Sequence, residues 1–309
     1  MLAGFLYYII VYPFSLMPLA ILYRFSDLFY IILISIFPYR KKIIDLNLKN
    51  AFPNKSASEL KVLRRKFYRH FSDLLIEGIK NLSISKNELE KRFKFRNPEI
   101  IDQLYRKNKS VILVSGHYNN WEWLITSLSL QIKHQAIGIG MPMTNKFWDK
   151  KVNEKRERFG LKVVHAKNYK KHLDNNKKAS YAVLNLSDQS PGNSYKSYWM
   201  NFLNQPTAVL YGTEKMAHEF NYAVVFFKIE KVKRGFYELS FDLICEEPRN
   251  TEWGFITEQH TNKLENLIIQ NPEFWIWSHK RWKREIPENL ESLKIIQKEK
   301  FLKQYFDKN

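Results

Sequence analysis

Residues 110–131 constrain the fold of this chain more than any other stretch. Residues 110–114 are apolar and mostly β-branched, which is typical of a buried strand. Gly116 permits a sharp exit from that strand, and residues 121–131 read as a helix. The sequence therefore predicts a strand–turn–helix unit with His117 in the turn.

The turn also carries a suitable helix cap and an acid. Asn119 or Asn120 is a good N-cap residue, and Glu122 lies five positions after His117. On one regular helix these two side chains would diverge by about 140°, so they meet only if His117 precedes the helix. The imidazole could then take a proton from a hydroxyl while the carboxylate holds its other ring nitrogen. The alternative is a structural ion pair or a surface histidine.

Further strands alternate with helices as far as about residue 245. This alternation predicts a single α/β domain with a mostly parallel central sheet flanked by helices. Gly138 and Gly140 lie in one predicted strand, but no third glycine completes a dinucleotide-binding fingerprint. The predicted strands after the first are 135–140, 161–164, 180–186, 223–227 and 235–244, with a basic segment at 169–178.

The N-terminus is strongly apolar. Residues 1–23 contain no charged side chain, and a second uncharged run, 28–39, is followed by Arg40-Lys41-Lys42. The first run is long enough to span a bilayer, although Pro13 and Pro18 interrupt it. We expect residues 1–42 to form a hydrophobic membrane anchor, either a spanning helix or a hairpin in one leaflet; a buried helix of a soluble protein is the alternative.

The rest of the chain divides into a domain and a tail. Residues 43–286 are expected to form the α/β domain, including a basic amphipathic helix at 57–80 that begins with a capping box. Residues 287–309 form a basic tail. The chain carries 50 Lys and Arg against 31 Asp and Glu, a net charge of +19, which favours anionic partners. Its single cysteine, Cys245, excludes a disulfide framework and a cysteine zinc site.

Other polar residues are candidates for substrate contacts. Asp188 and Gln189 follow the strand 180–186, and open α/β sheets place their sites at such carboxyl ends; an Asx-turn is the alternative. Arg156 could meet a phosphate or be a solvated helix charge. Residues 271–283 interleave aromatic and basic side chains, a pattern that also suits nucleic-acid binding.

Several of these stretches resemble one family in the same order along the chain. Residues 115–123, Ser-Gly-His-Tyr-Asn-Asn-Trp-Glu-Trp, resemble the His-x4-acid block of the bacterial lipid A biosynthesis (late) acyltransferases, within the glycerolipid acyltransferase superfamily. The Asp-Gln pair at 188–189 and the terminal block 271–283 are similar to later blocks of that family. Asn204 stands where a glycine is usual, and Lys280 where the first arginine is usual; asparagine tolerates the left-handed backbone that the turn needs.

The resemblance implies an acyltransferase that moves a fatty acyl chain to a hydroxyl of a lipid A precursor or related membrane lipid. His117 would be the general base and Glu122 its orienting acid. The donor would be an acyl carrier protein or coenzyme A thioester, with no bound cofactor or metal and no nucleic acid partner. The protein would act on an anionic membrane surface, at the bacterial inner membrane with its catalytic domain on the cytoplasmic side. The implied substrate-binding residues are Asn120, Arg156, Asp188, Gln189 and Arg281.

Two alternatives remain open at this point. The same chemistry could serve a lysophospholipid or an aminoacyl lipid acceptor. The chain could also be a basic, membrane-attached binding protein that performs no reaction.

Overall fold

A seven-stranded sheet organises the chain, in the order β1-β9-β8-β2-β5-β3-β4. Neighbouring strands are parallel except β8 and β9, which form an antiparallel hairpin. The computed structural model describes residues 2–175 and 179–306; Met1 of the predicted anchor, 176–178 of the predicted basic segment and 307–309 of the predicted tail lie outside them. The strands are β1 Phe93–Phe95, β2 Val111–Ser115, β3 Gln135–Gly140, β4 Lys162–His165, β5 Tyr181–Leu186, β8 Ala223–Lys233 and β9 Phe236–Cys245.

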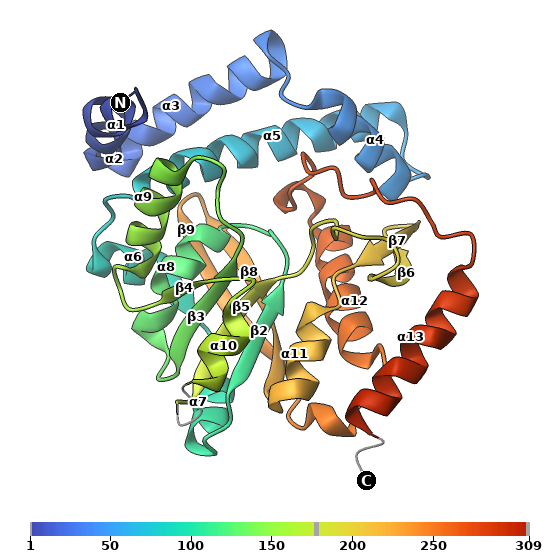
Figure 1. Cartoon of the computed structure of the whole chain (residues 1–309). Helices are drawn as coiled ribbons and strands as arrows, with labels where there is room; N and C mark the ends of the chain where they lie inside the picture. Colours follow the sequence, from blue (N-terminus) through green and yellow to red (C-terminus); the bar gives the residue numbers. More distant parts are fainter. Residues whose placement is uncertain (1, 176–178, 307–309) are drawn as a thin grey trace.

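Helices cover the sheet and one of its edges (Figure 1). The predicted helix 121–131 is confirmed as α8, and the capping box of Ser56 and Glu59 begins α5 as predicted. The helices are α1 Leu2–Phe5, α2 Tyr12–Leu16, α3 Leu19–Ile31, α4 Lys41–Ala51, α5 Ala57–Lys80, α6 Lys86–Arg92, α7 Glu99–Arg106, α8 Trp121–Gln131, α9 Lys146–Glu157, α10 Tyr169–Asp174, α11 Gly212–Phe220, α12 Phe255–Gln270 and α13 Leu290–Tyr305. Short π-helical segments occur at Leu6–Val11 (η1) and Ile32–Ile36 (η2), and 3-10 turns at Pro248–Asn250 (η3) and Pro272–Phe274 (η4).

A separate two-stranded hairpin follows the main run of strands. Its strands are β6, Tyr198–Phe202, and β7, Gln205–Val209. The turn residues Leu203 and Asn204 have φ of 52° and 61°, and two successive left-handed residues are what a tight hairpin turn requires. Asn204 therefore adopts the left-handed conformation that the sequence predicts for it.

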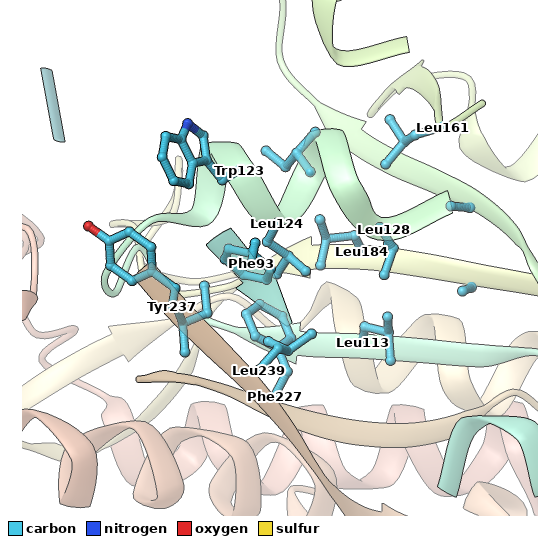
Figure 2. Packing of buried hydrophobic residues seen from close by; sticks show 14 of the residues in the cluster. Phe93, Leu113, Trp123, Leu124, Leu128, Leu161, Leu184, Phe227, Tyr237 and Leu239 are labelled. Atoms are coloured by element: carbon cyan, nitrogen blue, oxygen red, sulfur yellow. The ribbon is translucent and has the colours of Figure 1, made fainter. Parts of the chain in front are cut away.

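The main core lies between the sheet and α8. Trp123, Leu124 and Leu128 of α8 pack with Leu113 of β2 and Leu184 of β5, and Figure 2 shows these side chains together. All five residues of β2 are buried, as expected for a central strand of a parallel sheet covered on both faces. The predicted architecture, a mostly parallel sheet flanked by helices, is confirmed, and the packing fixes β2 and α8 on either side of the turn at 116–120.

Two long helices form a layer beside the carboxyl edge of the sheet. α3 runs along α5, and both lie above the strand ends in Figure 1. Leu19 and Leu22 of α3 belong to the main core cluster. Residues Leu19–Ile36 form one helical stretch of 18 residues, long and apolar enough to cross a membrane by length and composition.

Candidate active site

The turn after β2 holds His117 at the carboxyl edge of the sheet. Asn119 adopts φ of 54° and donates its backbone N–H to the carbonyl of Phe274, at 3.0 Å. Tyr118 forms an isolated antiparallel bridge with Trp275. The Asn120 side chain then caps α8, its Oδ1 accepting from Trp123 N at 2.9 Å. The turn is therefore fixed on one side by the helix cap and on the other by the segment from η4.

His117 and Asp188 form a close pair across two neighbouring strands. The Nδ1 atom of His117 lies 2.6 Å from Oδ1 of Asp188, and the backbone N–H of His117 donates to Oδ2 at 2.8 Å. Oδ2 also accepts from the indole Nε1 of Trp275, at 2.8 Å. β2 and β5 are paired in parallel, so the ends that carry His117 and Asp188 meet at one edge.

Gly116 makes this approach possible. A Cβ atom at this position would lie 2.7 Å from a side-chain carbon of Leu264 and 2.9 Å from Oδ2 of Asp188. Both distances are too short for a real side chain, so any substitution here would displace the carboxylate. Gly116 thus allows both a sharp strand exit and the close approach of Asp188.

His117 and Asp188 each stabilise the ionised form of the other. Burial opposes protonation of the imidazole, but the Asp188 carboxylate outweighs burial and raises the pKa of His117, with Glu122 adding to the effect. Burial alone would raise the pKa of Asp188, yet His117 and the Trp275 indole lower it to about 2. Asp188 is therefore an anion at neutral pH, able to stabilise an imidazolium.

The second ring nitrogen of His117 faces the accessible side of the site. The side chain is 18% exposed, whereas that of Asp188 is 1% exposed. The amide Nε2 of Gln189 lies 3.4 Å from Nε2 of His117, and the Trp121 ring packs edge-on against the imidazole. With Nδ1–H donating to Asp188, Nε2 keeps its lone pair, which here accepts from the Gln189 amide and can accept a proton as a general base does.

Glu122 does not take the position that the sequence predicts for it. Both of its oxygens accept from Arg156, with Oε1 to Nη2 at 2.5 Å and Oε2 to Nε at 3.1 Å. The prediction that Glu122 orients His117 is corrected, because the acid on Nδ1 is Asp188. The physical reason is that Glu122 lies in the first turn of α8 beside α9, whereas the imidazole turns toward the end of β5.

Asn120 and Arg156 are both engaged within the protein. Asn120 is buried, uses its oxygen as the helix cap and donates Nδ2 to Oε2 of Glu77 at 2.6 Å. The amides of Trp121 and Trp123 are bonded to Asn119 O and Asn120 Oδ1, so they do not present free donors to an oxyanion. Asn120 holds the turn rather than facing a substrate, which corrects its predicted role.

The terminal aromatic and basic block lies behind the pair. Arg281 is 2% exposed and donates Nη1 to the carbonyl of Ala208 at 2.8 Å, which does not suit the predicted contact with substrate. His279 Nε2 accepts from the backbone N–H of Ser190 at 3.1 Å, steadying the loop that carries Asp188. The block therefore buttresses the site from within.

Three contributors were not singled out from the sequence. Trp275 and His279 occur in the quoted terminal block, but only the fold shows that they contact Asp188 and its loop. Glu77 lies within a helix whose pattern gives no sign of a buried acid. Over residues 2–175 and 179–306, no group of three or more His, Cys, Asp and Glu side chains is placed to hold a metal ion.

Comparison with known proteins agrees with this geometry. Residues 1–284 match the family model described as bacterial lipid A biosynthesis acyltransferase. No curated protein matches the chain. The match covers more than nine-tenths of the 309 residues and includes the turn, the His117–Asp188 pair and the terminal block. The chain therefore belongs to the bacterial lipid A biosynthesis acyltransferases, a membrane-associated family of acyl-transferring enzymes.

Proposed function

We propose that this enzyme transfers a fatty acyl group from a carrier-protein or coenzyme A thioester to a hydroxyl of a lipid A precursor or related membrane lipid. His117 acts as the general base and Asp188 orients it. The observation that carries this proposal is the 2.6 Å contact between His117 Nδ1 and Asp188 Oδ1, which leaves the Nε2 lone pair toward the accessible side, beside the Gln189 amide.

The reaction needs one proton relay and no covalent enzyme intermediate. Nε2 of His117 removes the proton of the acceptor hydroxyl as the oxygen attacks the thioester carbonyl carbon. The C–O bond forms, the C–S bond breaks, and the imidazolium returns the proton to the departing thiolate. Asp188, bonded to the opposite nitrogen, stabilises the imidazolium between these two steps.

Gln189 and the Glu122–Arg156 pair flank the base. The Gln189 amide lies close enough to His117 Nε2 to donate to the carbonyl oxygen of a bound thioester. About a quarter of the side-chain surface of Glu122 and of Arg156 is exposed. Because Arg156 is bonded to both oxygens of Glu122, it can bind an anionic group only by sharing these bonds or giving them up. The charged pair thus lies beside the base rather than in the proton relay.

The donor and acceptor are assigned by chemical compatibility. A net charge of +19 suits an acidic carrier protein and a phosphorylated lipid. A lysophospholipid or an aminoacyl lipid would meet the same base with the same thioester, so both stay within the proposal as acceptors. The non-enzymatic binding protein is not retained, since the family consists of acyltransferases.

A transfer assay tests the proposal. Full-chain protein in lipid–detergent micelles is incubated with radiolabelled acyl-carrier or acyl-coenzyme A thioester and each acceptor class. His117→Ala should abolish transfer, while His165→Ala, on the edge strand β4, should retain it. Equal activity of the two variants would overturn the role of His117. Lipid mass spectrometry of cells lacking the protein would name the acceptor by the species that loses one acyl chain.

A further inference from the structure

The N-terminal helix α3 has two faces of different chemistry. Its inner face, with Leu19, Leu22 and Ser26 buried, packs toward α5, and so does Leu33 of η2, which continues α3. The outer side of α3 and η2 carries large apolar residues that are 39–60% exposed: Ile21, Phe25, Leu28, Phe29 and Ile31 of α3, and Ile36 of η2. Only 22% of the stretch Leu19–Ile36 is buried. A helix of this kind, apolar toward the outside and attached along its length to a domain, is suited to lie in a membrane interface.

Polar bonds hold the inner face of α3 to the catalytic domain. Ser26 Oγ donates to Oδ1 of Asp73 at 2.7 Å, and the Tyr23 hydroxyl donates to Oε1 of Glu77 at 2.6 Å. Both acceptors are buried carboxylates of α5. Crossing a bilayer would require α3 to leave α5 and break these bonds, exposing unpaired polar groups to hydrocarbon.

An ion-pair cluster at the middle of α3 adds to this attachment. Asp27 pairs with Arg69 of α5 at 2.7 Å and with Arg234 of the β8–β9 turn at 2.6 Å. Arg234 also contacts Asp73 and the carbonyl of Tyr23. Asp27 lies at the centre of Leu19–Ile36, so a spanning helix would place this charge in the hydrocarbon core, where charges are strongly disfavoured.

Hydrogen bonds also hold the segment before α3 to the catalytic domain. Lys80 Nζ donates to the carbonyls of Ser15 and Met17, at 3.2 and 3.1 Å, and Ser83 Oγ donates to Ser15 O at 2.6 Å. These bonds satisfy the carbonyls freed where α2 ends before Pro18. Residues Leu2–Leu16 form a shorter apolar helical stretch, whose outward residues Phe5, Ile9 and Leu16 are about 60% exposed.

Basic residues border this apolar surface. Arg24 is exposed on α3, Arg40, Lys41 and Lys42 follow η2, and Arg69 stacks over the Tyr30 ring. Anionic headgroups lie at the level where such side chains surround an interfacial helix. The positive border therefore matches a bilayer surface better than it matches a second copy of this strongly basic chain.

We propose that the N-terminal helical segments from α1 to η2 form an in-plane membrane anchor, lying along one leaflet on their outer apolar face without crossing the bilayer. The occupant of this face is the lipid bilayer with its anionic headgroups. The carboxyl edge of the sheet then lies on the membrane side of the domain, beneath the layer of α3 and α5 (Figure 1). His117, in the turn directly after β2, is at that edge. The inference concerns attachment, so its failure would leave the proposed chemistry untouched.

Spin-label depth measurements test the anchor directly. In a Cys245→Ser background, single cysteines replace Ile21, Leu28 or Ile36, and Ile295 on the exposed face of α13 serves as a matched control. The labelled full-chain protein is placed in vesicles of phosphatidylglycerol and phosphatidylethanolamine. We expect the three anchor labels to be accessible to oxygen, shielded from a water-soluble nickel reagent, and at depths that agree within about one helical turn of ~5 Å. The Ile295 label should contact water.

Other results would overturn the inference. A spanning helix or a leaflet hairpin would give depths that change steadily along α3 and η2, whose combined stretch Leu19–Ile36 of 18 residues covers about 27 Å. Labels shielded from both reagents would show that protein, such as a second copy, covers the face. Protease protection gives a second readout: epitope tags at both chain ends should be cleaved from the same side of sealed membrane vesicles, and cleavage from opposite sides would show a crossing.

Discussion

The carboxylate of Glu77 accepts a hydrogen bond from the side-chain amide of Asn120, with Oε2 and Nδ2 2.6 Å apart. The same fully buried carboxylate accepts from the hydroxyls of Tyr23 and Tyr237, at 2.6 and 2.7 Å. One acid of α5 therefore joins helix α3, strand β9 and Asn120, the cap of α8 that lies three residues after His117. The Glu77 carboxylate therefore both attaches the N-terminal helix α3 and holds the turn that carries His117.

Replacing Glu77 with glutamine should destabilise the protein. The amide group offers one acceptor oxygen to three buried donors, and each donor left unpaired costs about 1–3 kcal/mol. The Tm in detergent–lipid micelles should fall clearly below that of wild type, whereas Glu299→Gln on exposed α13 should leave it unchanged. Equal Tm values for the two variants would show that the network does not stabilise the fold.

Replacing Gly116 with alanine should impair catalysis. The added Cβ would lie 2.9 Å from the Asp188 carboxylate, and overpacking of this kind costs about 1–3 kcal/mol. Displacement of Asp188 should lower kcat more than it raises KM. The control is Gly192→Ala, where an added Cβ meets nothing within 4 Å. Wild-type kcat in both variants would contradict the role given to Gly116.

The pH dependence of transfer should report the charge beside His117. Since Asp188 raises the pKa of His117 above 6.5, the imidazole is protonated below that raised pKa and cannot accept a proton. The rate, as kcat/KM, should therefore fall with decreasing pH, with an acid limb whose midpoint lies above 6.5. A midpoint at or below 6.5 would contradict the assigned electrostatics.

Cys245 should be dispensable. Burial raises the pKa of its thiol to about 11, so very little thiolate exists at neutral pH to attack a thioester. Cys245→Ser should keep wild-type transfer rates, and mass spectrometry during turnover should find no acylated enzyme. Loss of activity in a folded serine variant would point to a covalent route.

Much of the architecture follows from local sequence patterns. The apolar β-branched run 110–114, the Asn cap and the period of α8 define the strand–turn–helix unit, and Asn204 marks the left-handed turn between β6 and β7. The hairpin itself and helix α11 were not predicted, because short amphipathic segments with mixed composition give weak periodic signals. Helix α12 begins at Phe255, directly after Gly254, whose φ is 90°.

The site was predicted less completely, for a different reason. Position in the chain places Glu122 near His117, but the partner of an imidazole depends on which strand ends are neighbours in the sheet. β2 and β5 are adjacent, and this pairing joins His117 to Asp188, 71 residues away. Asp188 was predicted as a site residue at a strand end, but its contact with His117 required the strand order.

The assignment of Asp188 as the partner of His117 is tested most directly by the pKa of the imidazole itself. With isotope-labelled histidine, NMR titration of the full chain in detergent–lipid micelles follows each imidazole, and His117→Gln identifies the signal by its loss. We predict a His117 pKa above 6.5 in wild type, a large fall in Asp188→Asn and a smaller fall in Glu122→Gln. A larger fall in Glu122→Gln than in Asp188→Asn would contradict the account.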